Sequence, residues 1–231
     1  MKRNIIILLF LICLVPGSVF FSQNQQTASI SGTITMPVLQ QERRVFRGRM
    51  YRNRLATPDK NRNKQQILQS SYIDIIVSAR PLSFKYETQP LPPVKILQLN
   101  AEFLPKVTPV TPGTIVQFIN RDNFFHNVFS ITPGSHFNIG RRPTGDIVEQ
   151  KITKIGETKL FCDIHTQMNA TIICLDTPYI TRVRADGRYQ LSNLPPGSYE
   201  VQIYHPDLTS VTRFIEISSG ESTTVNFRLN K

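Results

Sequence analysis

The sequence predicts an all-β protein for three reasons. Residue types that favour strands are frequent, among them 14 Phe and many Thr, Val and Ile in 231 residues. No long stretch repeats its apolar residues at helical spacing. The chain contains 16 Pro and 11 Gly, and in its C-terminal part turn signals recur about every ten residues, as in a β-sandwich.

The first 22 residues have the pattern of an export signal. Lys2 and Arg3 precede an apolar run over residues 5–15, which Pro16 and Gly17 interrupt. No small-x-small cleavage site stands out, and residues 5–21 reach the short limit of a membrane span, so an uncleaved N-terminal anchor is the alternative. In both cases we expect the globular part outside the cytoplasm, in the periplasm or on the outer face of the membrane.

Strands are predicted near both ends of the remaining chain. Residues 28–36 alternate, with Ile30 and Ile34 on one face, and residues 71–79 form a second apolar run. In the C-terminal part, residues 184–191 read as a turn that leads into a strand. Further strands are expected over residues 199–204, 213–217 and 223–229, with turns at 192–198 and 218–221.

The positive charge is concentrated in one segment. The chain carries a net charge of +11, and residues 41–66 alone account for +7. The basic pI therefore describes this segment and not the fold. One interpretation is a solvated loop. The other is a docking arm for an acidic redox partner or an anionic surface, whereas nucleic acid does not suit an exported protein.

The main functional signal is a set of metal-ligating side chains. Cys162, His165 and Met168 follow one another at three-residue spacing, and His126 lies 36 residues upstream. Two His, one Cys and a weak axial Met are the ligand set of a blue-copper electron-transfer site. Imidazole and sulfur ligands together suit both oxidation states of copper, so the set indicates one type-1 copper.

The neighbouring residues place these ligands between strands. Residues 160–161 and 170–175 read as strands, which puts Cys162, His165 and Met168 on one short loop. His126 lies between predicted strands at 116–122 and 128–131. Four aromatic residues near the ligands, Phe124, Phe125, Phe129 and Phe161, are expected to exclude water or to fill the sandwich core.

These residues resemble the cupredoxins, the family of plastocyanin and amicyanin. The resemblance covers roughly residues 92–178, in which residues 113–128 match the strand, turn and first copper His, and Cys-x2-His-x2-Met matches the short amicyanin-like loop. It implies a Greek-key β-sandwich with His126, Cys162, His165 and Met168 as copper ligands. Asn127 matches a family Asn that pins the ligand loops, while Asn169 stands where some relatives have Gly.

Other interpretations of the Cys and His residues remain. Cys162 and Cys174 are able to form a disulfide in an exported protein, zinc accepts a Cys-His-His set, and a Cys–His catalytic dyad is a third option. Cys174 alternates with Ile172 along a strand and reads as a buried apolar residue. His136 and His205 have no partners at ligand spacing and read as ordinary loop histidines.

The C-terminal part resembles the carboxypeptidase regulatory-like, or prealbumin-like, domains. It contains an Asp-Gly-x-Tyr-x-Leu hairpin at 186–191 and a Leu-Pro-Pro-Gly-x-Tyr turn at 194–199, while the Ser-Gly-x-Ile strand of the same pattern lies near residue 30. Exported methylamine-utilisation-like proteins have a similar combined order. We therefore expect a signal or anchor at 1–22, first strands at 28–89, a cupredoxin domain at 92–178 and the rest of the prealbumin-like sandwich at 179–231. The alternative is two consecutive domains.

The predicted function is that of an electron carrier. We expect an exported blue-copper protein that shuttles single electrons, without enzymatic activity, since no catalytic carboxylate pair, nucleophile elbow or phosphate loop is recognised. A copper storage or delivery protein would use the same ligands. A cell-surface interaction protein would instead use the prealbumin-like part and the basic segment.

Overall fold

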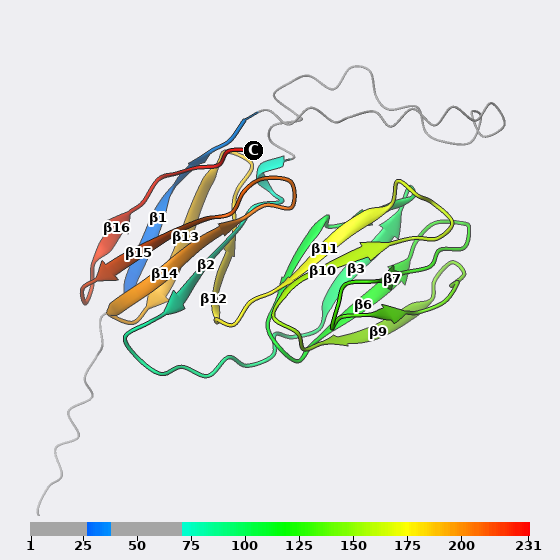
Figure 1. The fold of residues 1–231 in the computed structure, drawn as a ribbon, viewed down its shortest axis with the longest axis horizontal. Coiled ribbons are helices and arrows are strands. Elements are labelled where there is room, and N and C mark those ends of the chain that lie inside the picture. Colours follow the sequence, from blue (N-terminus) through cyan, green and yellow to red (C-terminus); the bar gives the residue numbers. More distant parts are fainter. Residues whose placement is uncertain (1–26, 38–70) are drawn as a thin grey trace, which may run out of the picture.

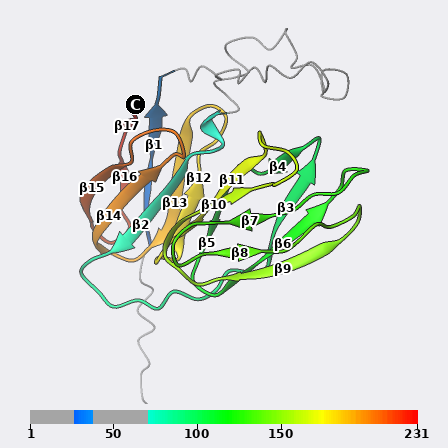
Figure 2. The same ribbon diagram turned by 45° about the vertical axis from the view of Figure 1, so that its right-hand side comes forward.

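The computed structural model describes residues 27–37 and 71–231. The predicted export signal at 1–22 and the basic segment at 41–66 lie outside the described residues. All named elements of the described part are strands, which form two β-sandwiches side by side (Figures 1 and 2). Within these two ranges, no helix has the length and apolar character that a membrane span requires.

The first sandwich, here called the metal sandwich, contains the strands from β3 to β11. One sheet has the order β4-β3-β6-β9 and the other the order β5-β11-β10-β7-β8. The bounds are β3 (Val94–Leu99), β4 (Glu102–Leu104), β5 (Val107–Val110), β6 (Thr114–Asn120), β7 (Phe129–Ser130), β8 (Phe137–Asn138), β9 (Ile147–Ile152), β10 (Gly156–Phe161) and β11 (Asn169–Cys174). Parallel pairs, β3 with β6 and β5 with β11, show that the sheets are built from crossovers and not from hairpins alone.

The second sandwich, here called the regulatory-like sandwich, uses strands from both ends of the chain. One sheet has the order β13-β1-β16, with β17 also paired to β1, and the other has the order β12-β2-β14-β15. The bounds are β1 (Ala28–Thr35), β2 (Ile76–Pro81), β12 (Tyr179–Arg182), β13 (Arg188–Leu194), β14 (Gly197–Tyr204), β15 (Val211–Ile217), β16 (Ser222–Thr224) and β17 (Phe227–Arg228).

The strand pairing bears on the order of the domains. β1 lies between β13 and β16, and β2 lies between β12 and β14, so strands before and after the metal sandwich share both sheets. Neither β1 nor β2 pairs with a strand of the metal sandwich. Strands that precede and strands that follow the metal sandwich in the sequence therefore share the two sheets of the second sandwich.

The two sandwiches share an apolar junction. Ile76 of β2 and Tyr204 of β14 pack in one buried cluster with Val107, Ile173 and Leu175 of the metal sandwich. In the same region Arg182 of β12 donates hydrogen bonds to the carbonyl oxygens of Ile73 and Val107, one in each sandwich. The junction therefore combines apolar burial with a guanidinium that bridges two backbones.

The predicted turn at 192–198 is shorter than expected, because β13 continues to Leu194 and β14 begins at Gly197. Two predicted strands differ more from the observed ones. Residues 71–75 form a turn, with the Asp74 and Ile75 amides bonded to the carbonyls of Ser71 and Tyr72, so the strand begins only at Ile76. The predicted final strand is split into β16 and β17. Between them the Val225 amide donates to the Ser31 carbonyl, and the Val225 carbonyl accepts from the Tyr189 hydroxyl. Because a side chain occupies this carbonyl, the regular backbone hydrogen-bond pattern is interrupted at Val225.

Candidate metal centre

The four predicted ligands come from two places in the metal sandwich. His126 lies in the connection between β6 and β7, where its backbone forms an isolated bridge with Arg142. Cys162 directly follows β10 and Met168 directly precedes β11, so the hairpin between these paired strands holds Cys162, His165 and Met168. A backbone bond from the Met168 amide to the His165 carbonyl, 2.9 Å long, tightens this loop.

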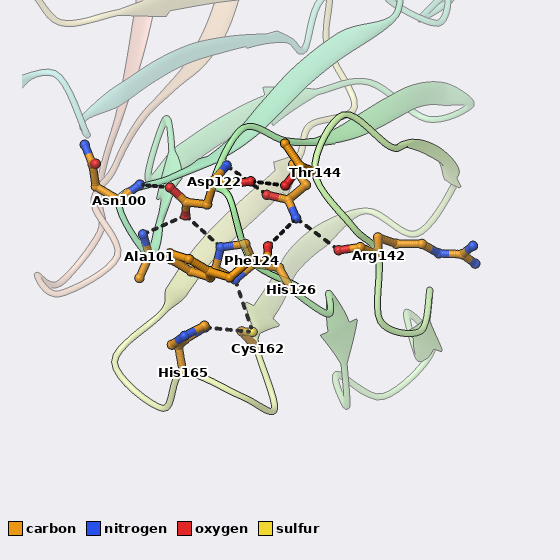
Figure 3. Close-up of polar contacts among 10 residues, drawn as sticks. Asn100, Ala101, Asp122, Phe124, His126, Arg142, Thr144, Cys162 and His165 are labelled. Carbon is orange, nitrogen blue, oxygen red and sulfur yellow. Dashed lines mark hydrogen bonds and ion pairs between the residues drawn. The ribbon is translucent and has the colours of Figure 1, made fainter. Parts of the chain in front are cut away.

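Three donor atoms of these residues converge. The Sγ atom of Cys162 lies 3.8 Å from Nδ1 of His126 and 3.9 Å from Nδ1 of His165 (Figure 3). One ligand atom from each of the three residues lies within 4.8 Å of the other two. Met168 is 1% exposed and belongs to the same buried cluster as Cys162. The predicted ligands are therefore brought together at one end of the core.

His126 is fixed on the side away from Cys162. Its side chain is fully buried, and its Nε2 lies 2.7 Å from Oδ2 of Asp122. Burial lowers the pKa of His126, but hydrogen bonds to Cys162 and Asp122 outweigh it, so the pKa lies above the ordinary value. With Nε2 occupied by the carboxylate, Nδ1 is the nitrogen that faces the sulfur.

The surroundings of Cys162 favour a thiolate. Burial opposes ionisation, but a hydrogen bond from His126 and backbone amides of Asn127, Ile164 and His165 outweigh it and hold the pKa of Cys162 below its ordinary value. Metal ligation and nucleophilic chemistry both require the thiolate. The contacts thus prepare the sulfur as an anionic donor.

His165 is only half-buried, and its ring lies beside the aromatic ring of Phe124. The Phe124 ring lies 5.0 Å from the His126 ring and 5.2 Å from the His165 ring. Phe124, Phe125 and Ile164 are 40%, 56% and 39% exposed. The alternative that Phe124 and Phe125 fill the sandwich core is wrong, because both side chains are exposed. Phe124 instead lies beside both imidazoles.

Several other sequence predictions are resolved here. Cys162 and Cys174 are both free and buried, so the disulfide alternative is not realised. Burial raises the pKa of Cys174 to about 11, which makes it an unreactive thiol. His136 is exposed, whereas His205 is 3% exposed, with its Nδ1 accepting from the Asp207 amide.

Two residues near the ligands differ from expectation. Asn127 contacts the site through its backbone amide, while its side-chain Oδ1 is buried without a hydrogen-bond partner. No sequence pattern singles out Asp122 as part of the site. Its position four residues before His126 was the available signal, but the distance from carboxylate to imidazole depends on how the chain folds back.

The donor set fits a copper ion. A thiolate and two imidazoles with an adjacent buried thioether are the ligands of type-1 copper, while a thioether contributes little to a zinc site. His126 is oriented by a carboxylate on its second nitrogen, as metal-bound imidazoles usually are.

The comparisons with known proteins agree with both resemblances stated from the sequence. Residues 167–230 match the family of carboxypeptidase regulatory-like domains. A search of the curated proteins found no matching sequence. Among solved structures, the copper-containing nitrite reductase from Thermus scotoductus SA-01 is 26% identical, with a TM-score of 0.36, over 42% of this chain and 26% of its own.

Two smaller proteins are also similar in structure. A purple cupredoxin from Nitrosopumilus maritimus is 22% identical over 36% of this chain and 99% of its own, with a TM-score of 0.33. A reduced mutant of amicyanin is 17% identical over 36% of this chain and 81% of its own, with a TM-score of 0.34. The all-β fold class is confirmed. The regulatory-like match begins at residue 167, so it includes β11 of the metal sandwich and omits β1 and β2, which complete the second one.

Proposed function

We propose that this chain is an exported type-1 copper protein that carries single electrons between redox partners. The observation that supports the proposal is the convergence of Cys162 Sγ with Nδ1 of His126 and Nδ1 of His165 beside the buried Met168. His126, Cys162 and His165 would be the strong ligands, and Met168 the axial one.

A bound copper ion would supply a one-electron Cu(II)/Cu(I) couple. Around it, the chain's own residues limit rearrangement. Cys162 and Met168 are held at the ends of the paired strands β10 and β11, and His126 is held by Asp122. Because these side chains are buried, a change of charge at the site would leave the ligand positions nearly unchanged.

The surface beside His165 is suited to partner docking. Phe124 is exposed and its ring lies 5.2 Å from the His165 ring, while the sequence neighbours Phe125 and Ile164 are exposed as well. We assign electron exchange to this edge, because His165 is the least buried of the three converging donors. The basic segment 41–66 would add attraction for an acidic redox partner or an anionic surface.

The remaining parts of the proposal rest on the sequence. The signal-like residues 1–22 support a location outside the cytoplasm, whether or not the segment is removed. The chain by itself would transform no substrate.

The deciding experiment is visible absorption spectroscopy of the copper-loaded protein before and after ascorbate. An intense blue band that bleaches on reduction establishes a Cys–Cu(II) bond and redox competence together. A colourless protein that binds one metal ion would reject the carrier proposal in favour of zinc binding or copper storage and delivery.

The matched variant is Cys162→Ser, with Cys174→Ser as its control. We expect Cys162→Ser to abolish the blue band and electron transfer, because a hydroxyl does not replace the thiolate donor. Cys174→Ser removes a thiol of the same core and should keep the band. If the physiological function survives in Cys162→Ser, the chain works as a surface interaction protein and the electron-carrier proposal fails.

A further inference from the structure

Strand β15 forms one edge of the regulatory-like sandwich. It is the last strand in the sheet order β12-β2-β14-β15, and among the strands of the described ranges it pairs only with β14. All seven residues of β15, Val211–Ile217, keep a continuous register with β14, without a bulge. The other side of β15 therefore presents a row of backbone N–H and C=O groups to which a further strand is able to bond.

The other edge strands in the described part of the chain are short or carry features that disfavour pairing. β4, β8, β16 and β17 have only two or three residues each. β5 contains Pro109, β9 contains Lys151, β12 has four residues and lies at the junction, and β13 has a register shift against β1. Proline, lysine, bulges and short length are the means by which sheet edges avoid pairing with another chain. β15 has none of them.

The middle residue of β15 is the most exposed of the large apolar side chains in the described ranges. Phe214 is 74% exposed. Its cross-strand neighbour on β14 is Glu200, whose carboxylate is already paired with Arg80 of β2. A single exposed Phe is common on protein surfaces, but Phe214 lies at the centre of a long edge that lacks protecting residues.

The residue order of β15 suits pairing with a second copy of the same strand. In an antiparallel pair with its two-fold axis at Phe214, the two Phe214 side chains face each other, and Thr212 lies opposite Glu216 of the second copy. An axis at Arg213 or at Glu216 would place like charges directly opposite each other, and an axis at Ile215 would place Phe214 opposite Glu216. Only the register centred on Phe214 brings the two rings together and also keeps like charges apart.

We propose that two copies of the chain pair through β15 in this register, which joins their β12-β2-β14-β15 sheets into one continuous sheet. At the opposite edge of the sheet, Arg182 of β12 contacts the metal sandwich. Figure 2 shows β15 on the side away from that sandwich, so the pairing leaves both candidate metal centres accessible. Two paired strands bury less than the interface of a stable dimer, about 1,200–2,000 Å², and the dimer is therefore weak.

Sedimentation of the full chain between about 10 µM and 1 mM tests the pairing. The wild type should shift from monomer to dimer over this range. Phe214→Glu and Phe214→Lys should each weaken association at least about tenfold, because like charges then meet at the axis. An equimolar mixture of these two variants should recover the dimer, since residue 214 faces residue 214 of the second copy. The apolar run at residues 5–15 is the same in every variant, so it does not contribute to the differences.

The control is Ile131→Glu, which changes an equally exposed kind of side chain in the metal sandwich, 66% exposed, and should leave association unchanged. A wild type that is monomeric at about 1 mM would overturn the proposal and leave the edge to a strand of another protein. Equal losses in Phe214→Glu and Ile131→Glu would also overturn it, because added charge alone would then be responsible. Failure of the mixture to associate would reject the self-pairing of β15. None of these outcomes depends on bound copper, so they are independent of the electron-carrier proposal.

Discussion

The two sandwiches have the same general architecture, but their cores contain different kinds of side chain at the ends. The regulatory-like sandwich has an apolar core, in which the hydroxyls of Tyr189 and Tyr199 bond to the carbonyls of Val225 and Pro195. The core of the metal sandwich instead continues into Cys162 and Met168 at one end. At that end the apolar core borders buried polar side chains. Their hydrogen bonds surround the cluster of Cys and His donor atoms.

This difference shows that the fold alone does not decide function. An apolar core stabilises a sandwich, whereas a cluster of donor side chains at one end of the core provides a candidate metal site. The regulatory-like sandwich is also not a separate appendage, because it packs on β5 and β11, and β11 begins at the residue after Met168. Three substitutions test how far the two sandwiches differ and how tightly they are joined.

The largest effect is expected from Gly32→Ala in β1. A Cβ atom at residue 32 would lie 1.9 Å from the carbonyl oxygen of Val225, which is backbone and has little room to move. We expect unfolding free energy, measured by urea denaturation, to fall by more than about 3 kcal/mol. If the sandwiches unfold as one unit, the blue copper band that we propose will be lost in the same transition as the far-UV signal.

The control is Gly145→Ala in the metal sandwich. No atom lies within 4 Å of its Cβ position, so only the φ of 87° opposes the change, at a cost of about 1–2 kcal/mol. If Gly32→Ala lowers the free energy of unfolding no more than Gly145→Ala does, β1 is only loosely packed in its sheet.

A smaller effect is expected from Arg182→Met at the junction. The variant keeps much of the side-chain volume but removes the bonds to Ile73 and Val107. Leaving these carbonyls unpaired should cost about 1–3 kcal/mol. Differential scanning calorimetry should then resolve two transitions where the wild type shows one.

Arg184→Met, an exposed arginine two residues further on, is the control and should change stability by less than about 0.5 kcal/mol. A single transition in Arg182→Met at unchanged temperature would show that the apolar cluster joins the sandwiches without this arginine.

The smallest effect concerns Asp74 beside the same junction. Burial raises the pKa of Asp74 from 3.8 to about 6. The positive charges of Lys106 and Arg182 oppose this rise, and the negative charge of Asp207 adds to it. Because the unfolded chain loses this proton first, stability falls as pH rises from 3.8 to about 6 and is level above.

Asp74→Asn should therefore be more stable than the wild type at pH 7, by about 1 kcal/mol for a half-buried group. The difference should disappear below pH 3.8. Urea denaturation across this range tests it, with the exposed Glu87→Gln as the control. A variant that is less stable at pH 7 would mean that the ionised carboxylate is held by the two cations.

What the sequence determined by itself was local in character. Cys162, His165 and Met168 lie on a loop of seven residues, so their spacing alone brings them together, and the alternation around Ile30 predicts a strand whatever its partner. The turn chemistry at Asp186–Gly187 and Pro195–Pro196 likewise belongs to neighbouring residues.

Only the tertiary structure decided which distant segments meet. It placed β1 between β13 and β16, left Phe124 exposed beside the two imidazoles, and brought Asp122 between His126 and the turn at Asn100 and Ala101. These contacts join residues that are far apart in the sequence, and no helical or strand periodicity of the sequence predicts them. They depend on register and burial in the complete fold, because a carboxylate orients an imidazole only when the folded backbones of both are already fixed.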